Sequence, residues 1–119
     1  MENRDGLSSD RPWGKYKVLS EEEKYKVKSV FVNPGHRLSL QRHRRRSEHW
    51  VIVSGKAVVT RGEETIELGE GETVEIKVGT VHRIENRESD ILIFVEVQFG
   101  DYFGEDDIER LQDDYARND

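Results

Sequence analysis

The chain has 119 residues, which is room for one domain with a core large enough to fold without disulfides. It contains no cysteine, so disulfides, thiolate metal sites and cysteine nucleophiles are excluded, and any metal must be bound through nitrogen and oxygen atoms. A net charge of -6 argues against a nucleic-acid surface, and the longest apolar run, Ile91 to Val95, is too short to span a membrane.

Residues 1–10 are polar and charged, without the apolar segment of a secretory signal. We predict that they form a flexible N-terminal segment and that the protein is cytoplasmic. The many charged residues and the lack of cysteine resemble the composition of heat-adapted proteins. A single domain is expected over residues 11–103, followed by a separate C-terminal element over residues 104–119.

Short alternating or β-branched stretches, separated by glycine-containing turns, fill the middle of the chain. They predict strands at residues 25–32, 37–43, 49–53, 56–61, 64–68, 73–78, 82–86 and 90–99. Many short strands at this spacing are typical of an all-β sandwich or barrel.

The end of the chain has a different pattern. Ile108, Leu111, Gln112 and Tyr115 recur at helical spacing, and acidic residues crowd the start of the segment. We therefore predict a short amphipathic C-terminal α-helix over residues 104–119 that packs on the barrel.

Four potential metal ligands lie at spacings that would bring them together. Gln41 and His43 are two apart on a predicted strand, so their side chains point the same way. Glu48 begins the next strand after a turn, and His82 follows a later glycine turn. Two histidines, an amide oxygen and a carboxylate suit one divalent ion, with zinc as first choice and manganese, cobalt or iron as alternatives.

The segment PGHRLSLQRHRRRSEHWVIVSG resembles the first cupin motif, and GETVEIKVGTVHRIEN resembles the second. Gln41 replaces the usual first histidine and keeps a donor atom, whereas Lys77 replaces the usual proline. The resemblance implies a double-stranded β-helix, or jelly-roll barrel, that holds one metal through Gln41, His43, Glu48 and His82.

A narrower resemblance covers most of the chain. RPWGKY, QRHRRRSEHW, HRIEN and EVQFGDYFGEDDIERLQDDYAR together are similar to type II mannose-6-phosphate isomerases. In that family the module is usually the C-terminal part of a bifunctional isomerase and mannose-1-phosphate guanylyltransferase. The resemblance implies a metal-dependent interconversion of mannose 6-phosphate and fructose 6-phosphate. The sequence has no Gly-rich nucleotide-binding start, so we predict no guanylyltransferase activity.

The isomerisation needs a base, and Glu96 is the first candidate. Alternation places Leu92, Phe94, Glu96 and Gln98 on one face of a strand, so Gln98 is expected to contact substrate beside it. The alternative is that Glu96 lies on a solvent face or pairs with an arginine. His49 is a reserve base, although alternation places it on the face opposite Glu48.

The phosphate of the substrate requires cations, for which Arg46, Arg83, Arg11 and Lys15 are the candidates. Arg46 is preferred, as a catalytic group at the barrel mouth, and a solvated basic rim is the alternative reading. Other functions stay open: a non-catalytic module that binds a sugar phosphate, or an isomerase or epimerase of another sugar such as glucose 6-phosphate. We also expect a homodimer, formed through an edge strand or a barrel face.

Overall fold

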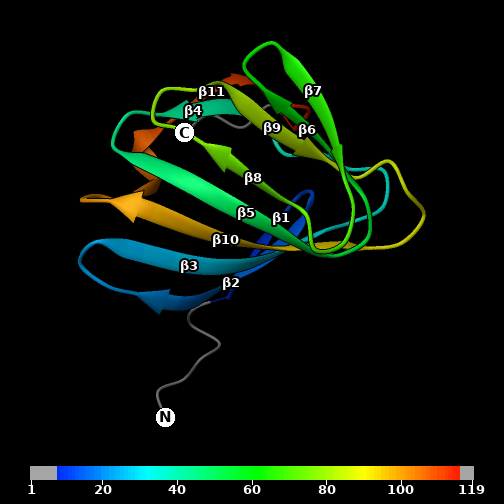
Figure 1. Ribbon diagram of the computed structural model, residues 1–119, viewed down its shortest axis with the longest axis horizontal. Helices are drawn as coiled ribbons and strands as arrows, with labels where there is room; N and C mark the ends of the chain where they lie inside the picture. Colours follow the sequence, from blue (N-terminus) through cyan, green and yellow to red (C-terminus); the bar gives the residue numbers. More distant parts are fainter. Residues whose placement is uncertain (1–7, 116–119) are drawn as a thin grey trace.

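The computed structural model describes residues 8–115, which form two antiparallel sheets that face each other (Figure 1). The first sheet has the order β1(Ser8–Arg11), β2(Gly14–Glu21), β3(Tyr25–Val32), β10(Leu92–Gly100), β5(Arg46–Ser54) and β8(Thr73–Ile76). The second has the order β11(Ile108–Gln112), β4(Leu40–His43), β9(His82–Glu85), β6(Ala57–Arg61) and β7(Glu64–Leu68). Each strand predicted from the sequence overlaps an observed strand, which confirms the all-β fold.

The core lies between the two sheets and follows from the alternation of side chains along each strand. On β5 and β10 every second residue is buried and its neighbours are more exposed. Ile52 and Phe94 from the first sheet are almost fully buried, as are Val59 and Ile84 from the second. Burial of these apolar side chains stabilises the pairing of the sheets by roughly 25 cal/mol per Å² removed from water.

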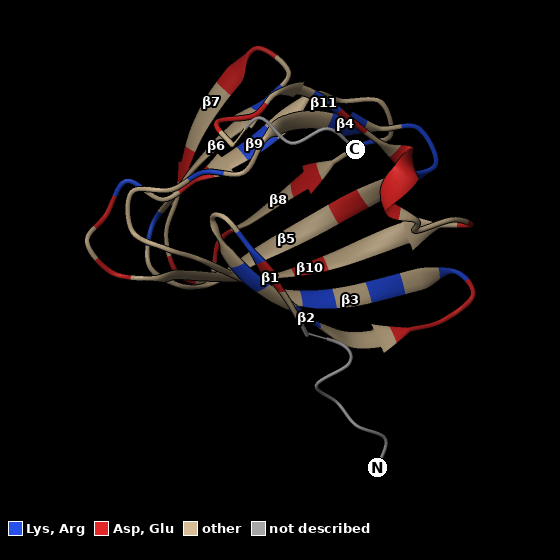
Figure 2. Ribbon diagram, turned by 180° about the vertical axis from the view of Figure 1, so that it is seen from behind, with Lys and Arg blue, Asp and Glu red and all other residues tan. Residues whose placement is uncertain are grey.

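The inner face of the first sheet is divided into an apolar half and a polar half. On the inner face of β5, the apolar Trp50 and Ile52 lie toward one end of the strand, and Arg46 and Glu48 lie toward the other. On β10, Phe94 lies in the apolar half and Glu96 in the polar half. Figure 2 shows these acidic positions on β5 and β10 beside basic positions on β3. The apolar half closes one end of the barrel, so the polar half is left to line a cavity.

The N-terminal prediction is wrong for residues 8–10. They belong to β1, which pairs with β2 from Ser8 opposite Lys17 to Arg11 opposite Gly14. Neither strand was predicted, because β1 is polar and β2 contains no buried residue, so both carry little apolar periodicity. Residues 1–7 lie outside the described residues.

The predicted C-terminal α-helix is also wrong over the described residues. Glu105–Asp107 form one 3₁₀ turn, and Ile108–Gln112 form β11. β11 pairs with β4 and thereby satisfies backbone groups along an edge that would otherwise face solvent. The guanidinium of Arg42 also binds the carboxylate of Glu109 at 2.9 Å. These non-local partners outweigh the local helical pattern. Residues 116–119 lie outside the described residues.

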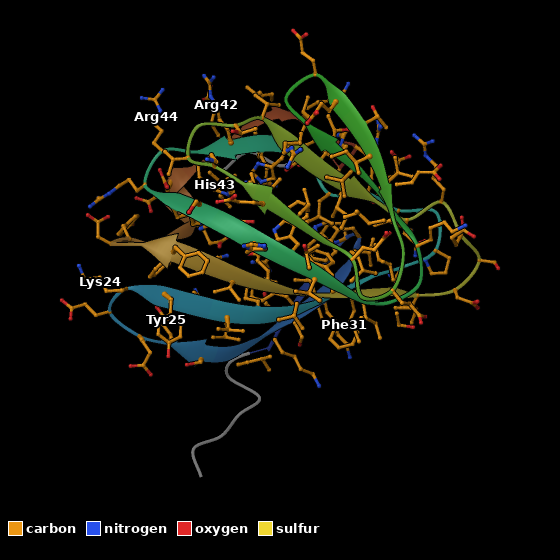
Figure 3. The ribbon with its side chains drawn as sticks, in the orientation of Figure 1. Lys24, Tyr25, Phe31, Arg42, His43 and Arg44 are labelled. Carbon is orange, nitrogen blue, oxygen red and sulfur yellow. The ribbon has the colours of Figure 1, made fainter. Side chains whose placement is uncertain are left out.

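The outer face of the first sheet exposes several apolar side chains. Val53 is 50% exposed and Phe99 is 47% exposed, and Figure 3 shows Tyr25 and Phe31 on this side of the barrel. The homodimer remains a prediction. Among residues 8–115 no helix is long and apolar enough to cross a membrane.

Gly14 is required where β2 approaches β3. A Cβ atom at this position would lie 1.9 Å from the backbone oxygen of Phe31. We expect Gly14→Ala to lower the free energy of unfolding by about 2–4 kcal/mol, because the two strands must separate. Gly62→Ala is the control, since a Cβ there meets nothing within 4 Å and only its φ of +63° is unfavourable. Equal effects of the two substitutions in denaturant unfolding would contradict this reading.

Candidate metal centre

His43, Glu48 and His82 form a buried cluster at the polar end of the barrel. They come from β4, β5 and β9, and their ligand atoms all lie within 4.8 Å of one another. Figure 3 shows His43 pointing between the sheets, whereas Arg42 and Arg44 on either side of it point outward. The fold therefore brings together three of the four predicted ligands from strands far apart in sequence.

Glu48 is held as a buried carboxylate anion. Arg46 donates from Nε to its Oε2 at 2.9 Å, and the Trp50 indole donates to its Oε1 at 2.8 Å. Burial alone would raise the pKa of Glu48, but Arg46 and the two histidines lower that pKa to about 2. The carboxylate is therefore ionised at neutral pH and available as an anionic ligand.

The two histidines are neutral at neutral pH. Burial lowers the pKa of His43 to about 4 and also lowers the pKa of His82. His82 donates from Nδ1 to the backbone oxygen of Thr80 at 2.9 Å, which leaves the lone pair of Nε2 available. The ring nitrogens of His43 face Arg46, at 2.9 Å from Nη2, and Glu48, at 3.6 Å.

Gln41 completes the donor set from the strand next to His82. The two residues are directly opposite in the pairing of β4 with β9. The Gln41 amide nitrogen donates to Ser39 Oγ at 2.8 Å, so its oxygen remains for a ligand. Two neutral imidazoles, one carboxylate and one amide oxygen fit a divalent ion of borderline hardness. Binding of a divalent metal ion here, and the identity of that ion, stay predictions.

One cavity lies beside this cluster. Its charged lining consists of Arg11, Lys28, Arg46, Arg83 and Arg110 together with Glu48, Glu96 and Glu105. Gln41 and His82 also contribute, as do the aromatic rings of Trp13, Tyr16 and Trp50. A cavity with an excess of cations and a metal-type donor set suits a small anionic ligand that carries oxygen atoms.

Glu96 lines this cavity from β10, as predicted. Its carboxylate accepts a hydrogen bond from the side-chain amide of Gln98. Burial and the nearby charge of Glu48 raise the pKa of Glu96 to about 7, although Lys28 and Arg46 act in the opposite direction. A carboxylate with such a pKa can accept and return a proton near neutral pH. The alternative of a solvent-exposed Glu96 is wrong, because the residue is only 7% exposed.

The structure changes the roles of two predicted residues. Arg46 does not lie at the barrel mouth: it is 3% exposed and is bound to Glu48 and His43. Its Nη1 is buried without a hydrogen-bond partner among residues 8–115. Gln98 is fully buried and does not line the cavity, and its amide donates to Glu96, so it positions the Glu96 carboxylate instead of facing the cavity itself.

Two further predicted residues lie on the outer surface. Lys15 is exposed and its Nζ lies 5.1 Å from the centroid of the Phe31 ring, away from the cavity lining. The reserve base His49 is exposed as well. Both point outward because each is one residue away from an inward position on its strand. Neither is retained in the site.

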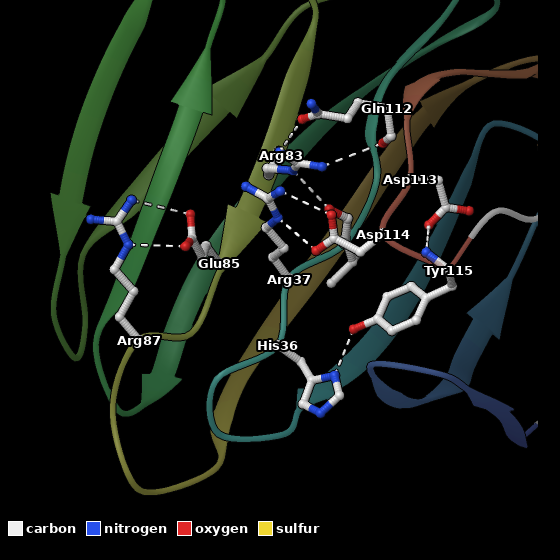
Figure 4. A network of polar contacts seen from close by, with 10 residues as sticks. His36, Arg37, Arg83, Glu85, Arg87, Gln112, Asp113, Asp114 and Tyr115 are labelled. Atoms are coloured by element: carbon white, nitrogen blue, oxygen red, sulfur yellow. Dashed lines mark hydrogen bonds and ion pairs between the residues drawn. The ribbon is translucent and has the colours of Figure 1, made fainter.

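Arg83 lines the cavity but is held by the end of the chain (Figure 4). Its Nε donates to the backbone oxygen of Leu38 at 2.9 Å, and its Nη1 donates to the Gln112 side chain at 2.7 Å. Figure 4 shows the neighbouring contacts of the same segment, in which Arg37 binds Asp114 at 2.7 Å. This network holds the segment after β11 against β9.

Sequence reasoning missed Lys28, Glu105 and the role of Trp50. Lys28 is 6% exposed and shares the inner face of β3 with Val30. The alternation along residues 25–32 could have indicated Lys28, since a lysine at an inward position of a strand requires an oppositely charged or polar partner. No local signal could have placed Glu105 in the cavity, because its position depends on the pairing of β11.

Comparisons of the sequence and the fold relate this chain to known proteins. The family model described as mannose-6-phosphate isomerase C-terminal matches residues 3–113. The xanthan biosynthesis protein XanB of Xanthomonas campestris pv. campestris is 48% identical over 107 residues, which are 90% of this chain and 23% of that protein. Mannose-1-phosphate guanylyltransferase 2 of Escherichia coli O157:H7 is 44% identical over 109 residues, with 92% and 23% covered. The chain thus spans about a quarter of the length of these relatives.

Solved structures support the fold. The cupin domain of Schizosaccharomyces pombe Cnp3 superposes with a TM-score of 0.70 at 18% identity, covering 73% of this chain and 64% of that one. At this identity the likeness shows the fold alone, which is the cupin double-stranded β-helix expected from the two motifs.

We expect His82→Ala to weaken zinc binding by more than roughly 100-fold, because it removes a ligand whose lone pair is already oriented. Calorimetric titration of metal-free protein with zinc measures this. His49→Ala is the matched control, since His49 is an exposed histidine on the neighbouring sheet. A His82→Ala protein that binds zinc as tightly as the His49→Ala protein would exclude His82 as a ligand.

The raised pKa of Glu96 has a consequence for stability. Between its ordinary value of 4.5 and about 7, the folded protein keeps a proton that the unfolded chain has lost. The retained proton therefore stabilises the folded protein fully below pH 4.5, and this stabilisation is lost as the pH rises through about 7. Glu96→Gln mimics the protonated form at every pH. In metal-free protein, the unfolding free energy of wild type minus that of Glu96→Gln should therefore fall as pH rises across this window. A difference that is constant with pH would show that Glu96 titrates normally.

Proposed function

We propose that this chain, which belongs to the mannose-6-phosphate isomerase C-terminal family, is a metal-dependent isomerase that interconverts mannose 6-phosphate and fructose 6-phosphate. The observation that carries the proposal is a cavity lined both by the buried carboxylate of Glu96 and by Glu48 and His82, two members of the three-residue metal-type cluster. Glu96 and Glu48 lie on adjacent inner strands, β10 and β5, so the base and the cluster can reach neighbouring atoms of one small substrate.

The reaction moves a proton between two adjacent carbons of an open-chain sugar. In the forward direction Glu96 takes the proton from C2, the carbon beside the aldehyde, and the C2–H electron pair forms the C1–C2 double bond of an enediolate with its negative charge on O1. The O2 hydroxyl proton is then transferred to O1, and the protonated Glu96 returns its proton to C1 as the C2 carbonyl forms, which gives the ketose. Gln98 holds the carboxylate in place throughout, because its amide nitrogen donates to the Glu96 oxygen.

The negative charge that develops on the substrate oxygens must be stabilised. His43, Glu48, His82 and Gln41 would hold a divalent ion, which supplies positive charge to polarise the carbonyl group. Arg46 supports this from the protein side. Its Nη1 is an unpaired donor at the cavity wall and can donate to a substrate oxygen, while its Nε keeps Glu48 ionised.

We expect purified protein, stripped of metal and then resupplied with zinc, manganese, cobalt or iron, to convert mannose 6-phosphate to fructose 6-phosphate in a coupled assay. Glucose 6-phosphate, tested in parallel, should react more slowly. Glu96→Gln should keep its metal but lose roughly 10²–10⁴-fold in turnover, since it removes the proton acceptor. The His49→Ala protein serves as the control with full turnover.

Each other outcome assigns a different function. If glucose 6-phosphate reacts faster than mannose 6-phosphate, glucose 6-phosphate is the preferred substrate, and the protein is still an aldose–ketose isomerase. Binding of a sugar phosphate, seen as a rise in melting temperature, without turnover under any metal would identify a non-catalytic sugar-phosphate module. Normal turnover by Glu96→Gln would remove Glu96 as the base.

A further inference from the structure

Lys28 is a buried cation that the proposed isomerisation does not use. It lies on the inner face of β3, is 6% exposed and lines the cavity. Its Nζ stands 4.1 Å from the centroid of the Tyr16 ring. Within residues 8–115 its one ion-pair partner is Glu105, whose Oε2 is 3.6 Å away, beyond hydrogen-bond distance.

This arrangement leaves the Lys28 ammonium group under-satisfied. An ammonium group has three donors, and burying it without hydrogen bonds is costly. Contact with the Tyr16 ring offsets part of that cost. An anion with several acceptor oxygens in the cavity would satisfy the remaining donors. The structure therefore has a reason to bind an anion at this point.

Arg11 provides a second cation at the same ring. Its guanidinium carbon lies 5.0 Å from the Tyr16 centroid, and its Nη2 donates to the Tyr16 hydroxyl at 3.2 Å. Its Nη1 donates to Ser9 Oγ and to the backbone oxygen of Asp10, which fixes the guanidinium in this place. Arg11 and Lys28 thus converge on one aromatic side chain at the wall of the cavity. Two cations beside each other match the two negative charges of a phosphomonoester better than a single carboxylate.

The other cavity arginines have roles or partners away from the Tyr16 ring. Arg46 binds Glu48 and His43, and its Nη1, which has no partner within residues 8–115, is the donor that the proposed isomerisation uses. Arg83 uses its donors on Leu38 and Gln112. Arg110 lies on β11 directly opposite Gln41, which places it at the metal end of the cavity. Lys28, whose ammonium group has one ion pair and makes no hydrogen bond within residues 8–115, is therefore the cation best placed to take a phosphate, and Arg11 adds its positive charge beside the same Tyr16 ring.

The strand order places these groups in a line across one inner face. β5, β10, β3 and β2 are successive neighbours in the first sheet. They carry Glu48, Glu96, Lys28 and Tyr16 in that order, with Glu96 directly opposite Lys28 in the pairing. Two steps between strands, from β5 to β3, span about 10 Å. A hexose 6-phosphate in open-chain form needs such a separation, because its phosphate is at the opposite end from the reacting carbons.

We propose that Lys28 and Arg11 bind the phosphate group of the substrate beside the Tyr16 ring. Glu105 forms an ion pair with Lys28 in the absence of ligand and is displaced when the phosphate binds. The proposal deepens the proposed function, on which the identity of the sugar rests. The ligand class itself, a phosphomonoester, rests on the two cations and the under-satisfied ammonium group.

Glu105 is suited to the role of a displaceable anion. It lies in the 3₁₀ turn before β11 and lines the cavity, yet its side chain is 41% exposed. Its carboxylate can return to water at little cost, since it makes no hydrogen bond to Lys28. A phosphate that enters the cavity competes with Glu105 for the same ammonium group, so removing the Glu105 charge should strengthen phosphate binding.

The test measures binding to metal-free protein, so that neither metal nor turnover is needed. Trp13 and Trp50 line the cavity and serve as fluorescence reporters, with calorimetry as a second measurement. The ligands are mannose 6-phosphate, inorganic phosphate and unphosphorylated mannose. Lys28→Met should weaken binding of both phosphate ligands by roughly tenfold or more and leave mannose unchanged. Glu105→Gln should strengthen binding of both phosphate ligands severalfold.

Lys15→Met is the matched control, because Lys15 also lies against an aromatic ring but on the outer face of the sheet. It removes the same charge from the protein and should leave all three affinities unchanged. If Lys28→Met and Lys15→Met lose equal affinity for the phosphate ligands, the loss comes from the overall charge of the protein, and the proposal is overturned. An equal loss for mannose would show damage to the cavity and overturn it as well. Zinc affinity checks that each variant retains the metal cluster.

If Lys28→Met does not fold, Arg11→Met and Glu105→Gln decide the question. Weaker phosphate binding in the first and stronger binding in the second support the subsite, and no change in either overturns it. The result is separable from the isomerase proposal. Phosphate binding through Lys28 without any sugar turnover would contradict the isomerase proposal and support the phosphate subsite. Turnover of mannose 6-phosphate with an unchanged KM in Lys28→Met would support the isomerase proposal and contradict the subsite.

Discussion

The buried charge of Glu48 is the constraint on which the rest of the site depends. A carboxylate that is 2% exposed is tolerated only if hydrogen bonds and opposite charges replace the water it has lost. Arg46 and Trp50 supply these bonds from the same strand, two residues before and two residues after it. The spacing is a direct result of strand geometry, since residues two apart share a face. One short stretch of β5 therefore builds and neutralises the anionic ligand of the cluster.

This arrangement explains why the barrel is polar at one end. The inner face of the first sheet places Glu48, Glu96 and Lys28 on adjacent strands, where an ordinary core would have apolar side chains. Neighbouring charges change the pKa of Glu96: the charge of Glu48 raises this pKa, and the charges of Lys28 and Arg46 lower it. The apolar half, around Ile52 and Phe94, provides the rigidity that keeps such groups in place. The apolar core and the charged candidate site thus lie in opposite halves of one sheet.

The end of the chain connects the fold to the site. β11 covers the free edge of β4, and the turn before it brings Glu105 to the cavity. The segment that follows is held by Arg83 and Arg37 through Gln112 and Asp114. A strand that closes a sheet edge thereby also contributes to the cavity wall. The same backbone pairing that protects the edge sets the position of an acidic side chain opposite Lys28.

The sequence by itself determined the barrel, the convergence of His43, Glu48 and His82 and the inward position of Glu96. Each depends on local periodicity or on the spacing of motifs within and between strands, and the fold preserves these directly. The tertiary structure alone decided the strands at residues 8–11 and 108–112, the burial of Arg46 and the pairing of Lys28 with Glu105. Residues 108–112 carry a helical pattern yet form a strand, because the edge of β4 offers hydrogen bonds that no local interaction can match. Long charged side chains such as Arg46 and Lys28 reach their partners across strands, and those partners become neighbours only when the sheets have formed.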